Sequence, residues 1–385
     1  MTASSVAKRD YVAARGAAVR RRHFDWGLLL ATAALMALGL VMIYSATRNV
    51  EIETGSWWDR SVFRQGVYAI VGLLLSLGFA AMDYHWWLAW ARWLYVVVLL
   101  VLGMTSVLGK TSFGARSWLQ FRYFDVQPSE LVKLFMVVIN ARLLGRDRES
   151  LESPRPLLLS VLALVPPVVL IYLQPDFGMA LVIVAVWIGM VFSAGVRWRH
   201  LLLILVFAGI AAPIIWFRLE DYMRVRILTF FFPEQDPSGA SYNINQALIS
   251  IGSGGWWGKG LFRGTQTQLH FLRVRHTDFI FSVLAEELGF IGAILLLALY
   301  SILLLRLVRI ADTAPDDAGR LIAAGVACAI FVQAFINLAM NVNLLPVTGL
   351  PLPLVSYGGS SLLTTSVGLG LAHSVASRSG RETWL

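Results

Sequence analysis

The membrane character of this chain is plainest in residues 157–194, which read LLLSVLALVPPVVLIYL-QPD-FGMALVIVAVWIGMVFSA. Two apolar runs without a charged residue flank a short turn that contains Asp176. Each run is close to the length of helix that crosses about 30 Å of hydrocarbon. The stretch therefore predicts two membrane-spanning helices joined by a tight turn.

The composition extends this interpretation to the whole chain. Of 385 residues, 57% are hydrophobic and only 14% are charged, and the net charge is +9. A soluble protein carries roughly 25% charged residues, which excludes a water-soluble domain of this length. The basic residues do not cluster on a soluble domain, which excludes nucleic-acid binding. The single cysteine, Cys328, lies in an apolar block, so neither a disulfide framework nor a Cys-based metal site is predicted.

Ten segments are long and apolar enough to span a membrane, which predicts an all-α polytopic membrane protein. Residues 1–25 form a basic tail, 26–377 one transmembrane domain and 378–385 a second tail. A long loop, 218–276, separates the seventh and eighth spans. The predicted spans are 26–46, 66–82, 88–108, 129–145, 157–173, 177–194, 200–217, 278–305, 321–341 and 358–376.

The distribution of Lys and Arg orients these spans. The N-terminal tail carries six of them, including Arg20, Arg21 and Arg22, and the C-terminal tail carries Arg378 and Arg381. Because short cytoplasmic loops are enriched in Lys and Arg, both tails are predicted to be cytoplasmic. The loop 218–276 then lies on the outer face, where long loops are usually functional. We interpret it as short amphipathic helices on the membrane surface, joined by glycine-containing turns.

This outer loop has more basic than acidic residues. Long loops are translocated largely regardless of charge, so the excess needs no functional explanation. The alternative is that it binds an anionic ligand, such as a lipid headgroup that carries phosphates. The basic residues are Arg218, Arg224, Arg226, Lys259, Arg263, Arg273 and Arg275.

Asp278 is the first candidate functional residue, because charged groups at the edge of a membrane are expensive. It lies in the run His276-Thr277-Asp278-Phe279 at the outer start of the eighth span. If 278–305 is one helix, small residues such as Ser282 and Gly289 share its face. The alternative is that Thr277 or Asp278 only caps the helix N-terminus.

Three other polar stretches lie at the same predicted side. Glu130 and Lys133 are three residues apart at the start of the fourth span, so they either form a structural ion pair or offer a cation to a phosphate. The local sequence favours the interpretation of Asp176 as the N-cap of the helix that follows it. Residues 345–361 contain three prolines, several glycines and Ser360, which predicts a re-entrant or broken segment lining a cavity.

No nucleotide-binding loop, His-x-x-x-His pair or Gly-x-Ser-x-Gly motif is present, so a nucleotide-driven motor or a protease is not predicted.

Six motifs in order resemble the SEDS family, the shape, elongation, division and sporulation proteins, and the resemblance covers all but the N-terminal tail. The stretches 265–269 and 283–289 are more similar to the RodA pattern than to the FtsW pattern. The motifs are Gly114–Leu119, Gln127–Leu131, Gln174–Gly178, Tyr242–Ile244 with Ile251–Gly255, His276–Phe281 and Leu345–Gly349.

The resemblance implies a ten-span peptidoglycan glycosyltransferase that polymerises lipid II, the undecaprenyl-pyrophosphate-linked disaccharide precursor, during cell elongation and rod-shape maintenance. It also implies a bacterial cytoplasmic membrane location and a class B penicillin-binding protein as partner. Asp278 matches the acidic residue regarded as catalytic, and Glu130, Lys133 and Asp176 match polar residues of the central cavity. The chain departs from the family pattern at Leu272-Arg273-Val274-Arg275, where the family usually reads Leu-Pro-Glu, and at Ala339 and Asn343, where it usually has glycine.

Combining the residues with the resemblance gives one mechanistic hypothesis. Asp278 is the general base that deprotonates the acceptor hydroxyl, and cationic side chains neutralise the pyrophosphates. No cofactor is predicted, and whether a divalent cation bridges the pyrophosphate stays open. A lipid flippase and a non-catalytic scaffold for a penicillin-binding protein are the alternatives. The candidate substrate-binding residues are Glu130, Lys133, Asp176, Arg224, Arg226, Arg275, Ser282 and Ser360.

Overall fold

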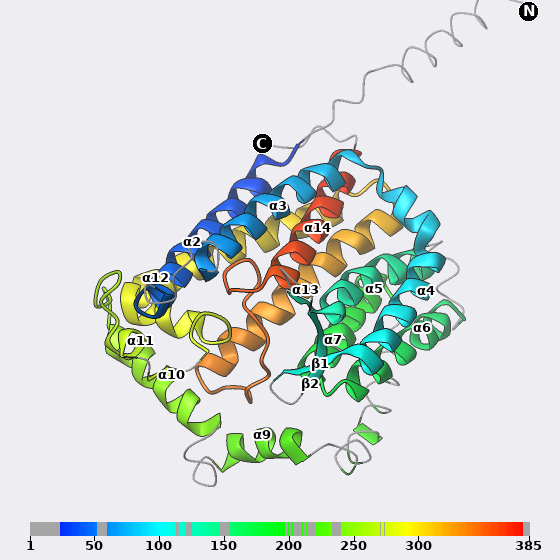
Figure 1. The fold of residues 1–385 in the computed structure, drawn as a ribbon. Helices are drawn as coiled ribbons and strands as arrows, with labels where there is room; N and C mark the ends of the chain where they lie inside the picture. The colour runs from blue at the N-terminus through cyan, green and yellow to red at the C-terminus, as the bar shows by residue number, and fades with distance from the viewer. Residues whose placement is uncertain are drawn as a thin grey trace, which may run out of the picture.

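A computed structural model of the chain shows a bundle of long helices (Figure 1). It describes residues 24–51, 60–112, 115–120, 125–145, 155–196, 221–232, 240–269, 271–272 and 274–379, with isolated positions between 199 and 217. Most of the predicted seventh span, 200–217, most of the two tails and Arg273 lie outside the described residues.

Nine of the ten predicted spans coincide with helices. In chain order these helices are α2 (Trp26–Glu51), α3 (Ser61–Ala81), α4 (Tyr84–Leu108), α5 (Pro128–Leu144), α6 (Arg155–Leu173), α7 (Phe177–Ser193), α12 (Ile280–Asp312), α13 (Asp317–Asn341) and α14 (Gly359–Ala376). Among the described residues, α2, α3, α4, α6, α12 and α13 are each long and apolar enough to cross a membrane. The chain is a predominantly helical, polytopic membrane protein.

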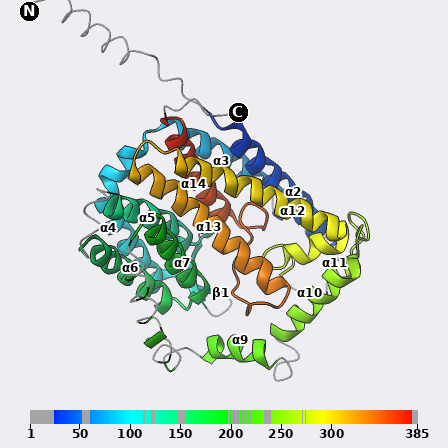
Figure 2. The same ribbon diagram turned by 180° about the vertical axis from the view of Figure 1, so that it is seen from behind.

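The helices α13 and α14 lie at the centre of the bundle. One side is formed by α4, α5, α6 and α7, and the other by α2 and α12, as Figures 1 and 2 show from opposite sides. α14 packs along α3, while α13 contacts α5, α7 and α12. In its most apolar stretch α13 is 72% buried, so its polar side chains must find partners inside the protein.

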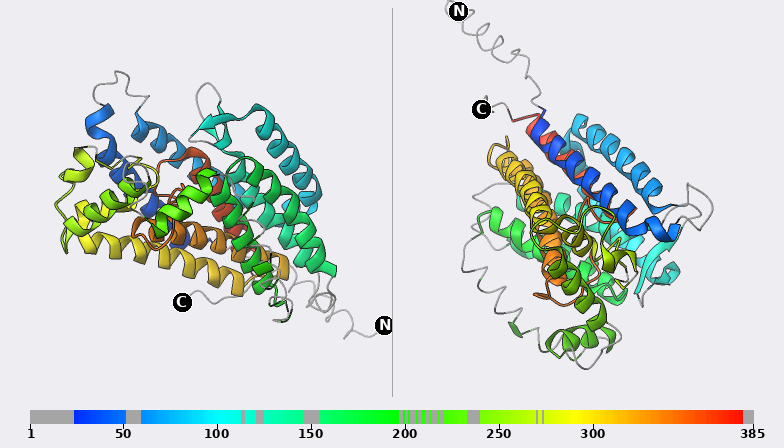
Figure 3. Two further views of the ribbon diagram at one scale, coloured as in Figure 1. Left: turned by 90° about the horizontal axis from the view of Figure 1, so that it is seen from below. Right: turned by 90° about the vertical axis from the view of Figure 1, so that its left-hand side faces the viewer.

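The predicted outer loop contains three helices: α9 (Asp221–Phe231), α10 (Ala240–Gly254) and α11 (Thr265–Gln268). They extend along one end of the bundle (Figure 3). The prediction of short helices in this loop is therefore confirmed. α10 packs against α12, so part of the loop covers the protein itself.

A small antiparallel sheet, which the sequence pattern did not predict, precedes α5. Its strands are β1 (Lys110–Ser112), β2 (Ala115–Gln120) and β3 (Asp125–Val126), in the order β1-β2-β3. Leu119 pairs with Val126 across β2 and β3. The strands are too short for a period-two pattern to stand out beside the spans.

The prediction of one regular helix over 278–305 was wrong in two respects. The helix begins only at Ile280, so Asp278 precedes it, and Gly289 interrupts it with φ 66° and ψ −160°. Such backbone angles are essentially restricted to glycine. Asp278, Ser282 and Gly289 therefore do not share one helical face.

The loop after α10 satisfies the backbone groups that this break exposes. The carbonyls of Glu286 and Glu287 accept from the amides of Lys259 and Gly260, each at 3.0 Å. Beyond the break, the amide of Phe290 donates to the Gly255 carbonyl at 2.9 Å. The glycine-rich turn thus replaces the missing helical hydrogen bonds, as buried backbone requires.

Candidate functional site

A cavity of about 800 Å³ opens at the end of the bundle where five helices begin. The starts of α3, α5, α7, α12 and α14 all contribute lining residues, and α9, β2 and residues 345–351 contribute others. Each helix start carries a partial positive charge from its free amide groups. Two arginines, Arg64 and Arg226, and three aspartates, Asp125, Asp176 and Asp278, also line the cavity, so it can bind an anionic group only at the arginines and helix starts.

Asp278 lines this cavity in the turn that leads into α12. Burial raises the pKa of Asp278 to about 6, although the Thr277 hydroxyl and the charge of Arg226 act in the opposite direction. A carboxylate with this pKa is ionised at neutral pH and is more basic than an ordinary aspartate. It has the properties required of a general base.

Arg226 and Gly349 lie beside Asp278. A Cβ atom added to Gly349 would be 3.8 Å from Asp278 Oδ2 and 4.0 Å from Arg226 Nη1. The absence of a side chain at Gly349 therefore leaves space between an acid and a cation. This part of the cavity therefore places a carboxylate and a guanidinium on either side of an open space.

Asp176 and Ser360 line the cavity from two other helix starts. Asp176 caps α7, since its Oδ1 accepts from the Met179 amide at 3.2 Å, as the capping interpretation predicted. Its Oδ2 accepts from the Gln127 side chain at 2.9 Å. Ser360 Oγ accepts from the Gln127 amide at 3.0 Å, so Gln127 joins the starts of α5, α7 and α14. Burial raises the pKa of Asp176, against the effect of these hydrogen bonds.

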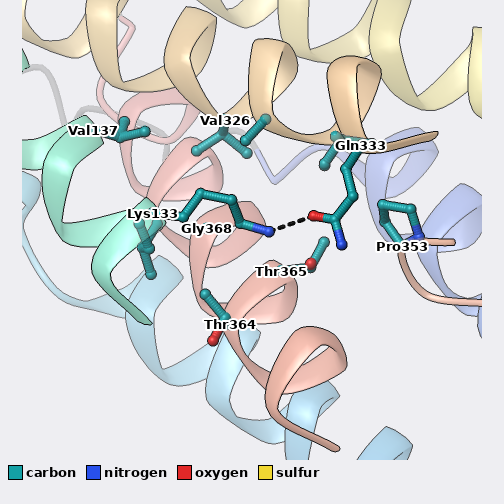
Figure 4. Close-up of a pocket in the computed structure, with 11 residues that line it drawn as sticks. Lys133, Val137, Val326, Gln333, Pro353, Thr364, Thr365 and Gly368 are labelled. Atoms are coloured by element: carbon teal, nitrogen blue, oxygen red, sulfur yellow. Dashed lines mark hydrogen bonds between the residues drawn. The ribbon is translucent and has the colours of Figure 1, made fainter. Parts of the chain in front are cut away.

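Glu130 and Lys133 form the predicted ion pair, but they do not line the cavity. Lys133 Nζ is 2.7 Å from Glu130 Oε2, and the two side chains are 5% and 0% exposed. Lys133 also donates to the Gln333 side chain, beside a separate void of about 20 Å³ bordered by Thr364 and other residues of α14 (Figure 4). The pair lies inside the bundle, where the structural alternative applies.

Three further candidates also lie away from the cavity lining. Arg224 donates to the Phe217 carbonyl at 2.8 Å, and Arg275 donates to the Ala46 carbonyl at 2.5 Å. Ser282 is fully buried, and its hydroxyl donates to Asn341 Oδ1 at 2.7 Å. Of the predicted site residues, the structure brings together Asp278, Arg226, Asp176 and Ser360.

Sequence reasoning missed several polar residues of this region. Arg64 and Tyr68 line the cavity from the first turns of α3, and Arg64 was overlooked because the predicted span began at residue 66. Gln333, Asn337 and Asn341 follow one face of α13 at four-residue intervals. Because residues four apart on a helix are neighbours, this spacing of amides in an apolar segment was a signal that could have found them.

The site can support the transfer of a group from an anionic leaving group to a hydroxyl. It offers two carboxylates of raised pKa, those of Asp278 and Asp176, cationic side chains from α3 and α9, and five helix starts. Among the described residues, no three His, Cys, Asp or Glu side chains are grouped to hold a metal ion.

Comparison with known proteins identifies the family of this chain. Residues 26–380 match the family model FTSW_RODA_SPOVE, described as cell cycle protein. The chain is 38% identical to peptidoglycan glycosyltransferase MrdB of Escherichia coli K12, over 92% of this chain and 93% of that protein.

Two solved structures are similar over nearly their whole length. One is a chain from a peptidoglycan synthase complex that coordinates polymerization and crosslinking, with a TM-score of 0.78 and 35% identity, covering 92% of this chain and 98% of that one. The other is the rod shape determining protein RodA of Thermus thermophilus, with a TM-score of 0.68 and 34% identity, covering 92% of this chain and 97% of that one. The chain therefore belongs to the FtsW/RodA/SpoVE family, the SEDS proteins.

Proposed function

We propose that this protein is a peptidoglycan glycosyltransferase that polymerises lipid II in the cavity at the start of α12. The relative of known name with 38% identity is a peptidoglycan glycosyltransferase, and the similar structure belongs to a peptidoglycan synthase complex. One observation in this chain carries the assignment of the site: a carboxylate with a pKa of about 6 faces a large cavity next to an arginine.

The reaction joins a donor sugar, linked through its anomeric carbon to a lipid pyrophosphate, to an acceptor sugar. The 4-hydroxyl oxygen of the acceptor attacks the anomeric carbon, and the bond from this carbon to the pyrophosphate oxygen breaks. Asp278 takes the hydroxyl proton, and the lipid pyrophosphate leaves with the electron pair. A single displacement inverts the anomeric centre, so no covalent enzyme intermediate is needed.

The leaving group requires neutralisation of its negative charge more than it requires a proton. Arg226 is a cation whose charge acts on the base, and Arg64 lines the same cavity from α3. The positive ends of the five helices add to this field. Lys133, Arg224 and Arg275 have no place in this mechanism, because their side chains are engaged elsewhere.

We base the membrane orientation on the distribution of Lys and Arg. We place both termini in the cytoplasm and the cavity on the outer side of the bacterial cytoplasmic membrane, as the Lys and Arg distribution predicts. Residues 26–377 then form one ten-span domain with a loop at 218–276. The similarity to MrdB and to RodA favours a role in cell elongation and rod-shape maintenance.

We further propose that the protein works with a class B penicillin-binding protein, whose transpeptidase crosslinks the new glycan. The similar chain from a synthase complex supports this proposal, because that complex coordinates polymerization with crosslinking. The large lipid-facing surface of α12, with Ile291, Ile294 and Leu295 exposed, leaves room for a neighbouring membrane helix.

The test is glycan polymerisation from lipid II by the purified full-length chain, with and without the transpeptidase. Products are separated by length, and Asp278→Asn is the matched inactive variant. A chelator arm shows whether a divalent cation at the pyrophosphate is required. Translocation of labelled lipid II across vesicles without any glycan product would overturn the enzyme assignment in favour of a flippase. Wild-type polymerisation by Asp278→Asn would exclude Asp278 as the base.

A further inference from the structure

Three consecutive backbone carbonyls lead into α12 at the cavity, and each has a partner outside this segment. The His276 carbonyl accepts from the Tyr357 amide at 2.9 Å. The Thr277 carbonyl accepts from Ser356 Oγ at 2.5 Å. The third carbonyl, that of Asp278, accepts from side chains of α13. These bonds replace the helical hydrogen bonds that this non-helical segment lacks.

Two buried asparagines hold the Asp278 carbonyl. Asn337 Nδ2 and Asn341 Nδ2 each donate to this oxygen at 3.0 Å. Both side chains are 0% exposed, and they lie one turn apart on α13. A carbonyl oxygen accepts two hydrogen bonds, so the two amides together saturate it and fix the peptide that follows the Asp278 side chain.

Asn337 also connects the Asp278 segment to the backbone of residue 350. Asn337 Nδ2 also donates to the Leu350 carbonyl at 2.7 Å, next to Gly349, which lies beside the Asp278 carboxylate. Ser282 Oγ donates to Asn341 Oδ1 at 2.7 Å. This bond sets the orientation of the Asn341 amide, because it keeps the oxygen toward Ser282 and the nitrogen toward Asp278.

A third side-chain amide, that of Gln333, lies one turn before Asn337 on α13. Gln333 Nε2 donates to the Pro351 carbonyl at 3.1 Å, and its Oε1 accepts from Lys133 (Figure 4). We call Gln333, Asn337 and Asn341 the amide row. It joins the buried Glu130–Lys133 pair, residues 350–351 and the segment that carries Asp278.

We propose that Asn337 and Asn341 are positioning residues for glycosyl transfer, and that Ser282 orients the amide of Asn341. Neither asparagine lines the cavity, so both act through Asp278 and the neighbouring Gly349–Leu350 backbone. The inference rests on the proposed function, in which Asp278 is the base. A base outside regular secondary structure needs such support, because small displacements from the reactive geometry are costly in rate.

The experiment compares Asn337→Leu and Asn341→Leu with a matched control, Asn140→Leu. Leucine keeps a similar volume and removes the donor. Asn140 is also buried, but its amide donates only to the Met136 carbonyl of its own helix, at 2.8 Å. Per mole of folded protein, we expect each amide-row variant to lose at least tenfold in kcat, with KM for lipid II changed less than twofold. Asn140→Leu keeps both constants.

Combination with Asp278→Asn separates positioning from a general structural role. If the asparagines act through the base, Asn341→Leu lowers kcat in the wild-type background and does not further lower the small residual kcat of Asp278→Asn. An equal loss in both backgrounds would show that the amide supports the fold and does not position the base.

Two milder variants keep the test valid if a leucine variant does not accumulate as folded protein. Ser282→Ala removes the hydroxyl that orients Asn341 and is expected to lower kcat severalfold, while Ser282→Thr retains a hydroxyl and recovers activity. Unchanged kcat in Ser282→Ala and Asn341→Leu, beside an active wild type and an inactive Asp278→Asn, would overturn this inference and leave the proposed function intact. An inactive wild type would overturn the proposed function instead.

Discussion

Replacing Asp278 with asparagine should remove activity and make the protein more stable at the same time. Burial raises the pKa of this carboxyl group from its ordinary value of 3.8 to about 6, so the folded state holds the ionised form at a cost. The difference corresponds to about 3 kcal/mol. Because the group lines a cavity and keeps part of its hydration, we expect about 2 kcal/mol. Asparagine has nearly the same shape and carries no charge.

The sign depends on pH in a defined way. A carboxyl group whose pKa is higher in the folded protein binds more protons there than in the unfolded chain, so the stability of the wild type falls as pH rises from about 4 to 6. The stability gained by Asp278→Asn should therefore be complete at pH 8 and absent near pH 4. The activity of the wild type should fall below pH 6, as the base becomes protonated.

Thermal unfolding of the purified protein, followed by tryptophan fluorescence at several pH values, measures the first effect. We expect the Tm of Asp278→Asn to exceed that of the wild type by a few degrees at pH 8, while kcat falls about 10²–10⁴-fold. Asp83→Asn is the control, for which we expect the Tm at pH 8 to change in the opposite direction and fall. Asp83 caps α4 and pairs with Arg378, and His85 and Arg378 lower its pKa against the effect of burial. A Tm of Asp278→Asn below that of the wild type at pH 8 would refute the reasoning.

Three further substitutions test the buried ion pair, the break in α12 and the space beside Asp278. Lys133→Met leaves Glu130 as a buried, unpaired charge and should destabilise the protein by about 3–5 kcal/mol. Adding Glu130→Gln should recover most of this stability in a denaturation experiment. If stability is not recovered, the pairing of Lys133 with Glu130 is contradicted. Gly289→Ala places a Cβ atom 2.3 Å from backbone at a positive φ and should cost several kcal/mol, seen as a lower Tm, whereas a neutral outcome would contradict the break in α12. Gly349→Ala, with φ +72° and a Cβ 3.8 Å from the Asp278 carboxylate, should lower kcat/KM for lipid II at least tenfold, and wild-type kinetics would show that substrate does not occupy this space.

The amphipathic and apolar patterns of the sequence were sufficient for the helices but not for their local irregularities. Nine predicted spans overlap helices within a few residues, since continuous apolar runs in a membrane have few alternatives to helix. α12 was predicted to end at residue 305 and continues to Asp312, because charged residues mark the edge of the apolar segment and do not end a helix. The break at Gly289 was missed, since an isolated glycine is tolerated in many helices.

In the candidate site, too, some residues could be found from the sequence and others only from the structure. Asp278 and Asp176 were found because acidic residues at span starts are rare and costly. Arg226 was one of seven basic residues in the outer loop, and nothing in the sequence distinguished it from Arg224 or Arg275. Only the folded chain shows that Arg226 faces the cavity and that the other two bind backbone carbonyls.

By itself the sequence determined the class of the protein and the approximate positions of the helices, and it singled out the acid that we propose as the base, because these follow from local composition and from motifs read in order. The tertiary structure alone decided which charges meet the substrate cavity and which are paired within the bundle. It also showed that Ser282, which was predicted to bind substrate, donates a hydrogen bond to Asn341 of the amide row. The physical reason is that a hydrogen bond between residues separated by about sixty positions in the chain, such as that between Asn341 and Asp278, depends on how two helices pack, and no local pattern encodes that packing.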